Sequence, residues 1–234
     1  MDIELLLLPS PLLGPATWEP VATHLRAAGW STSVASSKGP PATTQDVLEA
    51  FLEAAPSDRE VVLVPHSNAG LYAPALIHAR HVAATIFVDA ALPPVSGAAR
   101  LAPDWLLTSL RELADEQQML PPWSAWWDEA DLEGLYPTPG MRSRVQAQEA
   151  RLPLSYFESS LAIQTGWVTE PCAYLAFGDT YADELHQAEK HQWPVRSVVG
   201  GHLHALHDPE LVAKVILDLL AELPARPRPA TMSG

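Results

Sequence analysis

Apolar runs of strand length alternate with segments of helical period along most of this chain. The runs that indicate strands cover residues 3–9, 30–36, 60–66, 83–89, 172–178 and 195–199. Between the first two, apolar residues recur at helical spacing from Trp18 to Leu25, and Gly29 ends that segment. Repeated β–α units with almost continuously apolar strands favour a parallel sheet covered on both faces. The sequence therefore predicts an α/β fold around a mostly parallel sheet of about six strands.

Two further helices have clear signals. Thr43 or Thr44 is a suitable N-cap for a helix that carries Val47 and Phe51 on its apolar side. A closing helix is predicted over residues 208–223, where leucine and valine recur along one side. The chain would then end in a proline-containing tail, residues 224–234, that we expect to be disordered.

Residues 95–165 interrupt the alternation because they show no strand pattern. An insertion of this length in a compact domain is typical of a lid or a binding element. We therefore expect a core of residues 1–94 and 166–223 and a helical lid of residues 95–165. The insertion holds four of the eight tryptophans, which either pack the lid onto the core or line an apolar substrate pocket; they are Trp105, Trp123, Trp126 and Trp127.

The most informative motif follows the strand at residues 60–66. That strand leads directly through Pro65-His66-Ser67-Asn68-Ala69-Gly70 into a helix. A strand–serine–helix turn holds the serine hydroxyl above the sheet edge, with small residues two before and two after the serine. Pro65 and Ala69 stand where the usual pattern has glycine. Ser67 is the predicted nucleophile, and an ordinary strand-to-helix turn is the alternative.

A histidine loop follows the last predicted strand. It reads Gly200-Gly201-His202-Leu203-His204 and precedes the closing helix. A histidine there can reach over the sheet edge to the serine as general base, so we predict this role for His202. The alternative is a metal cluster of His202, His204 and His207, but no carboxylate or cysteine constellation accompanies them. We expect no metal and no cofactor, and we expect His204 and His207 to be dispensable.

With these motifs the chain resembles the α/β-hydrolase superfamily, in particular its small esterase and hydroxynitrile-lyase-like members. The elbow, the Gly-Gly-His loop and the opening segment of residues 8–14 carry the resemblance, which covers nearly the whole chain. It implies the α/β-hydrolase fold and the order serine, acid, histidine along the chain. In the family the acid usually follows the strand that ends here at Gly178, but that spacing falls on Tyr181.

Two carboxylates remain as candidates for the acid. Asp89 closes the strand that follows the nucleophile helix, a position that some superfamily members use, and Asp179 lies two residues before Tyr181. We predict Asp89, with Asp179 as the alternative. A structural carboxylate that caps the following turn is the other interpretation of Asp89.

The oxyanion hole also departs from the family pattern. One donor should be the backbone N–H of Asn68. The second donor position of the first loop falls on Pro11, which has no N–H. Loss of one such donor costs about 3–4 kcal/mol in the transition state. Either Leu12 or the Ser10 hydroxyl replaces it, or the reaction forms no full oxyanion.

Charge and cysteine content limit the partners. The net charge of −14, with only 14 lysines and arginines, argues against nucleic-acid binding. The single cysteine, Cys172, permits no internal disulfide, and the apolar stretch at residues 5–8 is too short for a secretory or membrane segment. We expect a cytoplasmic protein without a membrane partner, whose oligomeric state the sequence leaves open.

Three functions agree with these residues. The first is a serine hydrolase that cleaves an ester, lactone or thioester of a hydrophobic small molecule with Ser67, His202 and an aspartate. The second is a non-hydrolytic lyase, cyclase or isomerase of natural-product biosynthesis on the same fold, which Pro11 favours. The third is a catalytically silent protein that binds a small molecule.

Overall fold

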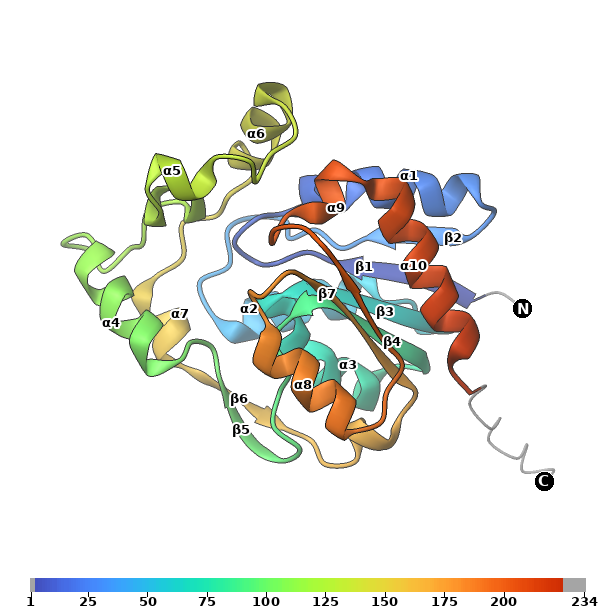
Figure 1. The fold of residues 1–234 in the computed structure, drawn as a ribbon. Coiled ribbons are helices and arrows are strands. Elements are labelled where there is room, and N and C mark those ends of the chain that lie inside the picture. Colours follow the sequence, from blue (N-terminus) through green and yellow to red (C-terminus); the bar gives the residue numbers. More distant parts are fainter. Residues whose placement is uncertain (1–2, 225–234) are drawn as a thin grey trace.

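The computed structural model describes residues 3–224 and has a six-stranded sheet at its centre (Figure 1). The strands are arranged in the order β2-β1-β3-β4-β7-β8, and all neighbours pair in parallel. This confirms the predicted fold class and the sheet of about six strands. The strands are β1 (Ile3–Leu8), β2 (Ser31–Val34), β3 (Glu60–Ser67), β4 (Val82–Ala90), β7 (Cys172–Phe177) and β8 (Val195–Val198).

Helices cover both faces because successive strand side chains point to opposite sides. Leu5 and Leu7 of β1 belong to one buried cluster, and Leu6 and Leu8 belong to the other. Thr43 begins α2 through a capping box with Asp46, which decides between the two predicted caps. The cluster that contains Leu5 and Leu7 lies under α1 (Glu19–Ala27) and α10 (Pro209–Glu222), with the short α9 (His204–His207) beside them. The cluster that contains Leu6 and Leu8 lies under α2 (Thr44–Ala54), α3 (Ala73–Ala79) and α8 (Ala182–Lys190).

The segment between β4 and β7 is mostly helix and turn. Its helices are α4 (Asp104–Leu113), η3 (Trp123–Trp126), α5 (Glu129–Leu132), α6 (Pro139–Gln146), α7 (Leu154–Glu158) and η4 (Trp167–Thr169). The expectation that it holds no strand is wrong, because β5 (Gly97–Arg100) and β6 (Ser160–Ile163) pair antiparallel. Each has four residues, which is too short to produce a periodic signal.

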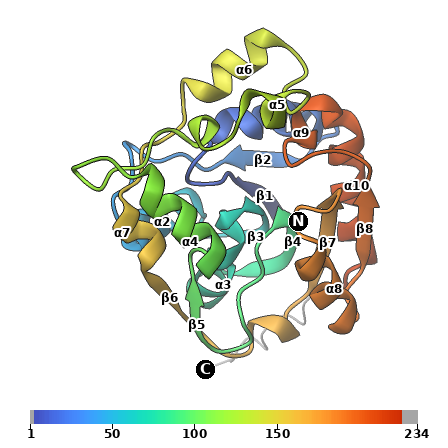
Figure 2. The ribbon, with the colours of Figure 1, turned by 60° about the vertical axis from the view of Figure 1, so that its left-hand side comes forward.

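This segment lies at the carboxyl ends of the central strands. In Figure 1, β1 starts near the N terminus at the right and runs towards the helices α4 to α6 at the left; in Figure 2, α4 lies in front of the sheet and α6 lies above it. The loop after β1 and the turn after β3 both open at this edge, where the strand order reverses between β1 and β3. Ligands of open α/β sheets bind at such a point.

Two short helical turns were not predicted. The helix after β3 begins as the 3₁₀ helix η2 (Asn68–Tyr72) before α3, and a short η1 (Pro15–Thr17) precedes α1. The predicted disordered tail lies outside the described residues, except for Pro224. Among residues 3–224 no helix is both long and apolar enough to cross a membrane.

Candidate active site

Ser67 is the last residue of β3 and sits on a strained turn. Its φ of 58° and ψ of −133° lie in a region that non-glycine residues avoid, and such a conformation costs about 1–3 kcal/mol. The Ser67 carbonyl accepts a hydrogen bond from the Ala91 N–H at 3.1 Å, which ties the turn to the end of β4. The side chain is nearly buried. The local structure is thus the sharp strand–serine–helix turn that the motif predicted.

The small residue that this turn requires is Gly70. A Cβ atom at Gly70 would lie 2.1 Å from the Ala91 carbonyl oxygen, so no other residue fits there. Ala69 is fully buried and stands at the position where the usual pattern has glycine. Pro65 pairs with Leu8 of β1, and the β3–β4 register is irregular two residues later. The close approach of helix and strand is therefore made by the third residue after the serine.

The structure places His202 beside Asp89. The His202 Nδ1 atom lies 2.6 Å from Asp89 Oδ2, and the other carboxylate oxygen accepts the Phe177 N–H at 2.9 Å. Asp89 is fully buried and has a φ of 42°. Since the carboxylate accepts a hydrogen bond from Nδ1–H, the Nε2 atom of His202 is left as the ring nitrogen that can accept a proton. Asp179, the alternative acid, is exposed on the loop after β7.

Ser67 Oγ makes its hydrogen bond with Tyr181. The two oxygens lie 3.3 Å apart, and among the described residues no hydrogen bond joins Ser67 to the His202 ring. Catalytic hydrogen bonds are often long in structures without substrate. Sequence reasoning noted Tyr181 only because it stands where the family has its acid, which did not indicate a contact with Ser67.

His66 packs directly behind His202. The two rings stack with centroids 4.5 Å apart, and His66 Nε2–H donates to the His202 carbonyl oxygen at 3.0 Å. Burial, and then the neighbouring His202 ring, hold the pKa of His66 well below its usual value, so this ring is neutral. His66 therefore supports the loop that carries His202.

One group of potential metal ligands occurs among residues 3–224. It consists of His66, Asp89 and His202, whose ligand atoms lie within 4.8 Å of one another. The His66 Nε2 and His202 Nδ1 atoms already form the hydrogen bonds described above, which a metal ion would have to replace. These hydrogen bonds account for one ring nitrogen of each histidine without an ion.

His204 and His207 do not join this group. They begin and end α9, and their rings stack on each other with centroids 6.2 Å apart. The His204 ring also covers Gly200, where a Cβ would lie 2.3 Å from its Nδ1 atom. Burial, and then His207, lower the pKa of His204. The His204 side chain thus packs on the loop that carries His202, and His207 packs on His204.

The first loop after β1 has its backbone donors turned inward. The Leu12 N–H points to Ser10 Oγ at 3.4 Å, and the N–H groups of Leu13 and Gly14 both donate to the Ser10 carbonyl oxygen. Pro11 has no N–H. Ser10 itself is buried. Of the predicted oxyanion donors, Leu12 is therefore engaged within the loop, while the backbone N–H of Asn68 lies directly after the nucleophile.

The side chain of Asn68 joins the elbow to the insertion. Its Nδ2 donates to the Leu101 carbonyl oxygen at 3.0 Å, and its Oδ1 accepts from the Tyr156 hydroxyl at 2.8 Å. The Tyr156 hydroxyl also lies 2.8 Å from that of Tyr72. This buried chain of hydrogen bonds fixes the insertion against the residue that follows Ser67.

The four tryptophans of the insertion have different environments. Trp123 is nearly buried, with its ring centroid 6.3 Å from that of His202. Trp127 packs against Trp123, and Trp126 packs against Phe157. Trp105 is 65% exposed on α4. The structure thus brings Trp123 to the histidine and leaves Trp105 at the surface.

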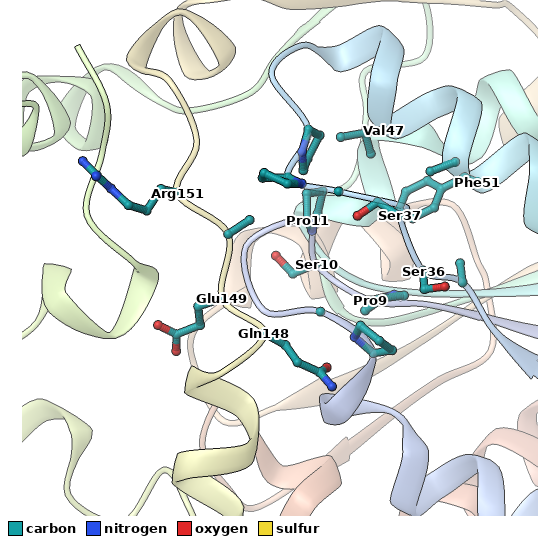
Figure 3. Close-up of a pocket in the computed structure, with 18 of the residues that line it drawn as sticks. Pro9, Ser10, Pro11, Ser36, Ser37, Val47, Phe51, Gln148, Glu149 and Arg151 are labelled. Atoms are coloured by element: carbon teal, nitrogen blue, oxygen red, sulfur yellow. The ribbon is translucent and has the colours of Figure 1, made fainter. Parts of the chain in front are cut away.

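A cavity of about 650 Å³ opens beside the first loop (Figure 3). Ser67, His202 and Asp89 are not among the residues that line it. Four parts of the chain share its wall, namely the first loop (Pro9, Ser10, Pro11), the segment after β2 (Ser36, Ser37), helix α2 (Val47, Phe51) and the insertion (Gln148, Glu149, Arg151). The first loop is therefore the element that the cavity shares with the predicted oxyanion hole.

Comparison with known proteins finds matches among solved structures. No family model and no curated protein matches the sequence. Solved structures do match over nearly their whole length. An extracellular α/β-hydrolase from a Paenibacillus species is 14% identical, with a TM-score of 0.70 over 96% of this chain and 100% of that one.

Two further matches are similar in extent. A pyrethroid hydrolase from Sphingobium faniae is 18% identical, with a TM-score of 0.69 over 94% of this chain and 98% of that one. Tomato methylketone synthase I is 11% identical, with a TM-score of 0.65 over 95% and 99%. Together with the parallel sheet and the strained serine turn, these matches confirm that the chain has the α/β-hydrolase fold.

Proposed function

We propose that the chain is a serine hydrolase that cleaves an ester, lactone or thioester of a hydrophobic small molecule. The observation that carries the proposal is the 2.6 Å contact between His202 Nδ1 and the buried Asp89 carboxylate, at the edge of the sheet where Ser67 lies on its strained turn. A buried carboxylate in this place orients the ring and stabilises the imidazolium ion that forms when the ring accepts a proton. We assign Ser67, His202 and Asp89 as nucleophile, base and acid.

The proposed reaction has two stages. Ser67 Oγ attacks the carbonyl carbon as its proton passes to His202 Nε2, and the carbonyl electron pair moves onto the oxygen. When that pair returns, the bond to the leaving group breaks and the leaving group takes the proton from His202. Water then attacks the acyl-enzyme, with His202 again as base, and Ser67 is released with its proton restored.

The surroundings of His202 support a hydrophobic substrate. Trp123 places an aromatic ring beside His202, with the two ring centroids 6.3 Å apart. The similar structure from Sphingobium faniae is named a pyrethroid hydrolase, a name that agrees with an apolar ester substrate. We assign Trp123 to the substrate pocket, and Trp105, Trp126 and Trp127 to the packing and outer surface of the insertion.

A panel of chromogenic esters with increasing acyl length tests this proposal. Wild-type protein should hydrolyse the longer apolar members, and Ser67→Ala should lose turnover without loss of its melting transition. Equal hydrolysis by both proteins would contradict the assignment of Ser67.

Pro11 supports a second candidate, a lyase, cyclase or isomerase that uses the same Ser67 and His202. The first loop supplies no free backbone donor at residues 11–14, so an oxyanion would be held less well than in an ordinary esterase. The tomato structure of this fold is named a synthase. Mass spectrometry during turnover separates the candidates, because only the hydrolase passes through an acyl group on Ser67.

A further inference from the structure

Tyr181 contacts the nucleophile from the side of His202. It lies on the loop between β7 and α8, immediately before Ala182, the first residue of α8. Its hydroxyl is 3.3 Å from Ser67 Oγ, and its ring centroid is 5.7 Å from that of His202. A serine hydroxyl can donate one hydrogen bond and accept two. Ser67 can therefore give its proton to His202 while it accepts the hydroxyl hydrogen of Tyr181.

The surroundings keep the Tyr181 hydroxyl protonated. Burial raises the pKa of Tyr181 above its usual value, and the negative charges of Asp89 and Glu184 raise it further, while the bond with Ser67 opposes them. A neutral phenol is a hydrogen-bond donor. At any pH at which His202 works as a base, Tyr181 thus offers an O–H group to the reacting oxygens.

The first loop leaves a need for such a donor. Pro11 has no N–H, and the N–H groups of Leu12, Leu13 and Gly14 all point to Ser10. Of the backbone donors predicted for the oxyanion hole, the Asn68 N–H is the one that takes no part in these loop contacts. Removal of one donor lowers turnover about 10²–10³-fold in serine hydrolases.

We propose that Tyr181 is a further catalytic residue, whose hydroxyl donates a hydrogen bond to the negative charge that develops at the Ser67 reaction centre. This inference rests on the proposed hydrolase function. The Ser67 proton still passes to His202, and the new Oγ–carbon bond pushes the carbonyl pair onto oxygen. Tyr181 keeps its proton throughout and stabilises the negative charge that develops on Ser67 Oγ as the serine proton passes to His202.

The test compares Tyr181→Phe with Tyr136→Phe. Each removes one hydroxyl and keeps the ring, and among the described residues the Tyr136 hydroxyl bonds to neither Ser67 nor His202. Ester hydrolysis and the rate of phosphorylation by diethyl p-nitrophenyl phosphate are measured for both. Tyr181→Phe should lower kcat and the phosphorylation rate about 10²-fold or more, with KM changed only slightly, and Tyr136→Phe should behave as wild type.

If Tyr181→Phe keeps the wild-type rates, Tyr181 has no catalytic role. The hydrolase assignment still stands in that case, provided that Ser67→Ala is inactive. If Ser67→Ala were as active as wild type, the proposed function itself would fail. Should Tyr181→Phe not fold, a ring-fluorinated tyrosine at position 181 gives the answer, because its hydroxyl is a stronger donor. A faster reaction supports the proposal, and an unchanged one contradicts it.

Discussion

Asp89→Asn should lower turnover steeply and leave the fold intact. In the wild type one carboxylate oxygen accepts the Phe177 N–H at 2.9 Å and the other accepts the His202 Nδ1 proton at 2.6 Å. An amide has only one acceptor oxygen. If that oxygen stays on Phe177, the NH₂ group faces Nδ1, and the ring must carry its proton on Nε2. His202 in that tautomer cannot accept a proton from Ser67.

The opposite orientation of the amide costs free energy. It would set the NH₂ group against the Phe177 N–H and leave that buried donor unsatisfied, a penalty of about 1–3 kcal/mol. The active tautomer is then disfavoured by about 5- to 150-fold. Loss of the negative charge that stabilises the imidazolium ion adds to this, so kcat should fall about 10²–10⁴-fold. The φ of 42° at Asp89 suits asparagine, so the melting temperature should change little.

Steady-state hydrolysis of a chromogenic ester, with thermal melting as the measure of folding, checks this prediction. Asp179→Asn is the matched control, because Asp179 is exposed and should be replaceable without loss. If Asp89→Asn keeps turnover within a few-fold of wild type, or if Asp179→Asn is the variant that loses it, Asp89 does not orient His202.

Four other variants probe the remaining parts of the site. Ser67→Gly should unfold at a higher temperature than Ser67→Ala, because glycine removes the cost of about 1–3 kcal/mol at a φ of 58°; equal melting temperatures would mean that the turn is unstrained. His202→Ala should lower kcat about 10²–10⁴-fold and His204→Ala far less, and equal losses that added zinc restores would instead indicate a metal site. Because the folded protein holds His66 neutral, the unfolded state binds more protons below pH 6.5 and stability falls there with decreasing pH; His66→Gln should flatten this fall in denaturant titrations, and an unchanged slope would contradict it. Trp123→Ala should raise KM for apolar esters more than for acetate esters, and equal effects on both would remove Trp123 from the substrate pocket.

The sheet and the elbow could be predicted because their signals are local. Six apolar runs locate the six strands, with the least exact match at residues 30–36, where β2 covers only Ser31–Val34, and the strand that leads into Ser67 does so without a break. Gly70 was not recognised as the residue of close approach, because the need for glycine there arises from the Ala91 carbonyl, which lies just after β4. Likewise the strands β5 and β6 are only four residues long and pair across the insertion.

Only part of the site could be predicted, because contacts between distant loops leave little trace in the sequence. Asp89 was chosen from its place at a strand end, and the structure sets it next to His202. Tyr181 marked a gap in the family pattern, but nothing in the sequence indicated that its hydroxyl meets Ser67 from a loop 114 residues away. The inward turn of the first-loop amides toward Ser10 depends on backbone geometry that composition does not encode.

The most direct measurement is the site of labelling by a fluorophosphonate, read by mass spectrometry of the digested protein. Such a reagent bonds covalently to a serine only where a base removes the hydroxyl proton. We expect one adduct per chain, on the peptide that contains Ser67, with no adduct in Ser67→Ala and labelling slowed about 10²–10⁴-fold in His202→Ala. An adduct on another serine, or none under conditions that label a control esterase, would contradict the assignment of Ser67 as an activated nucleophile.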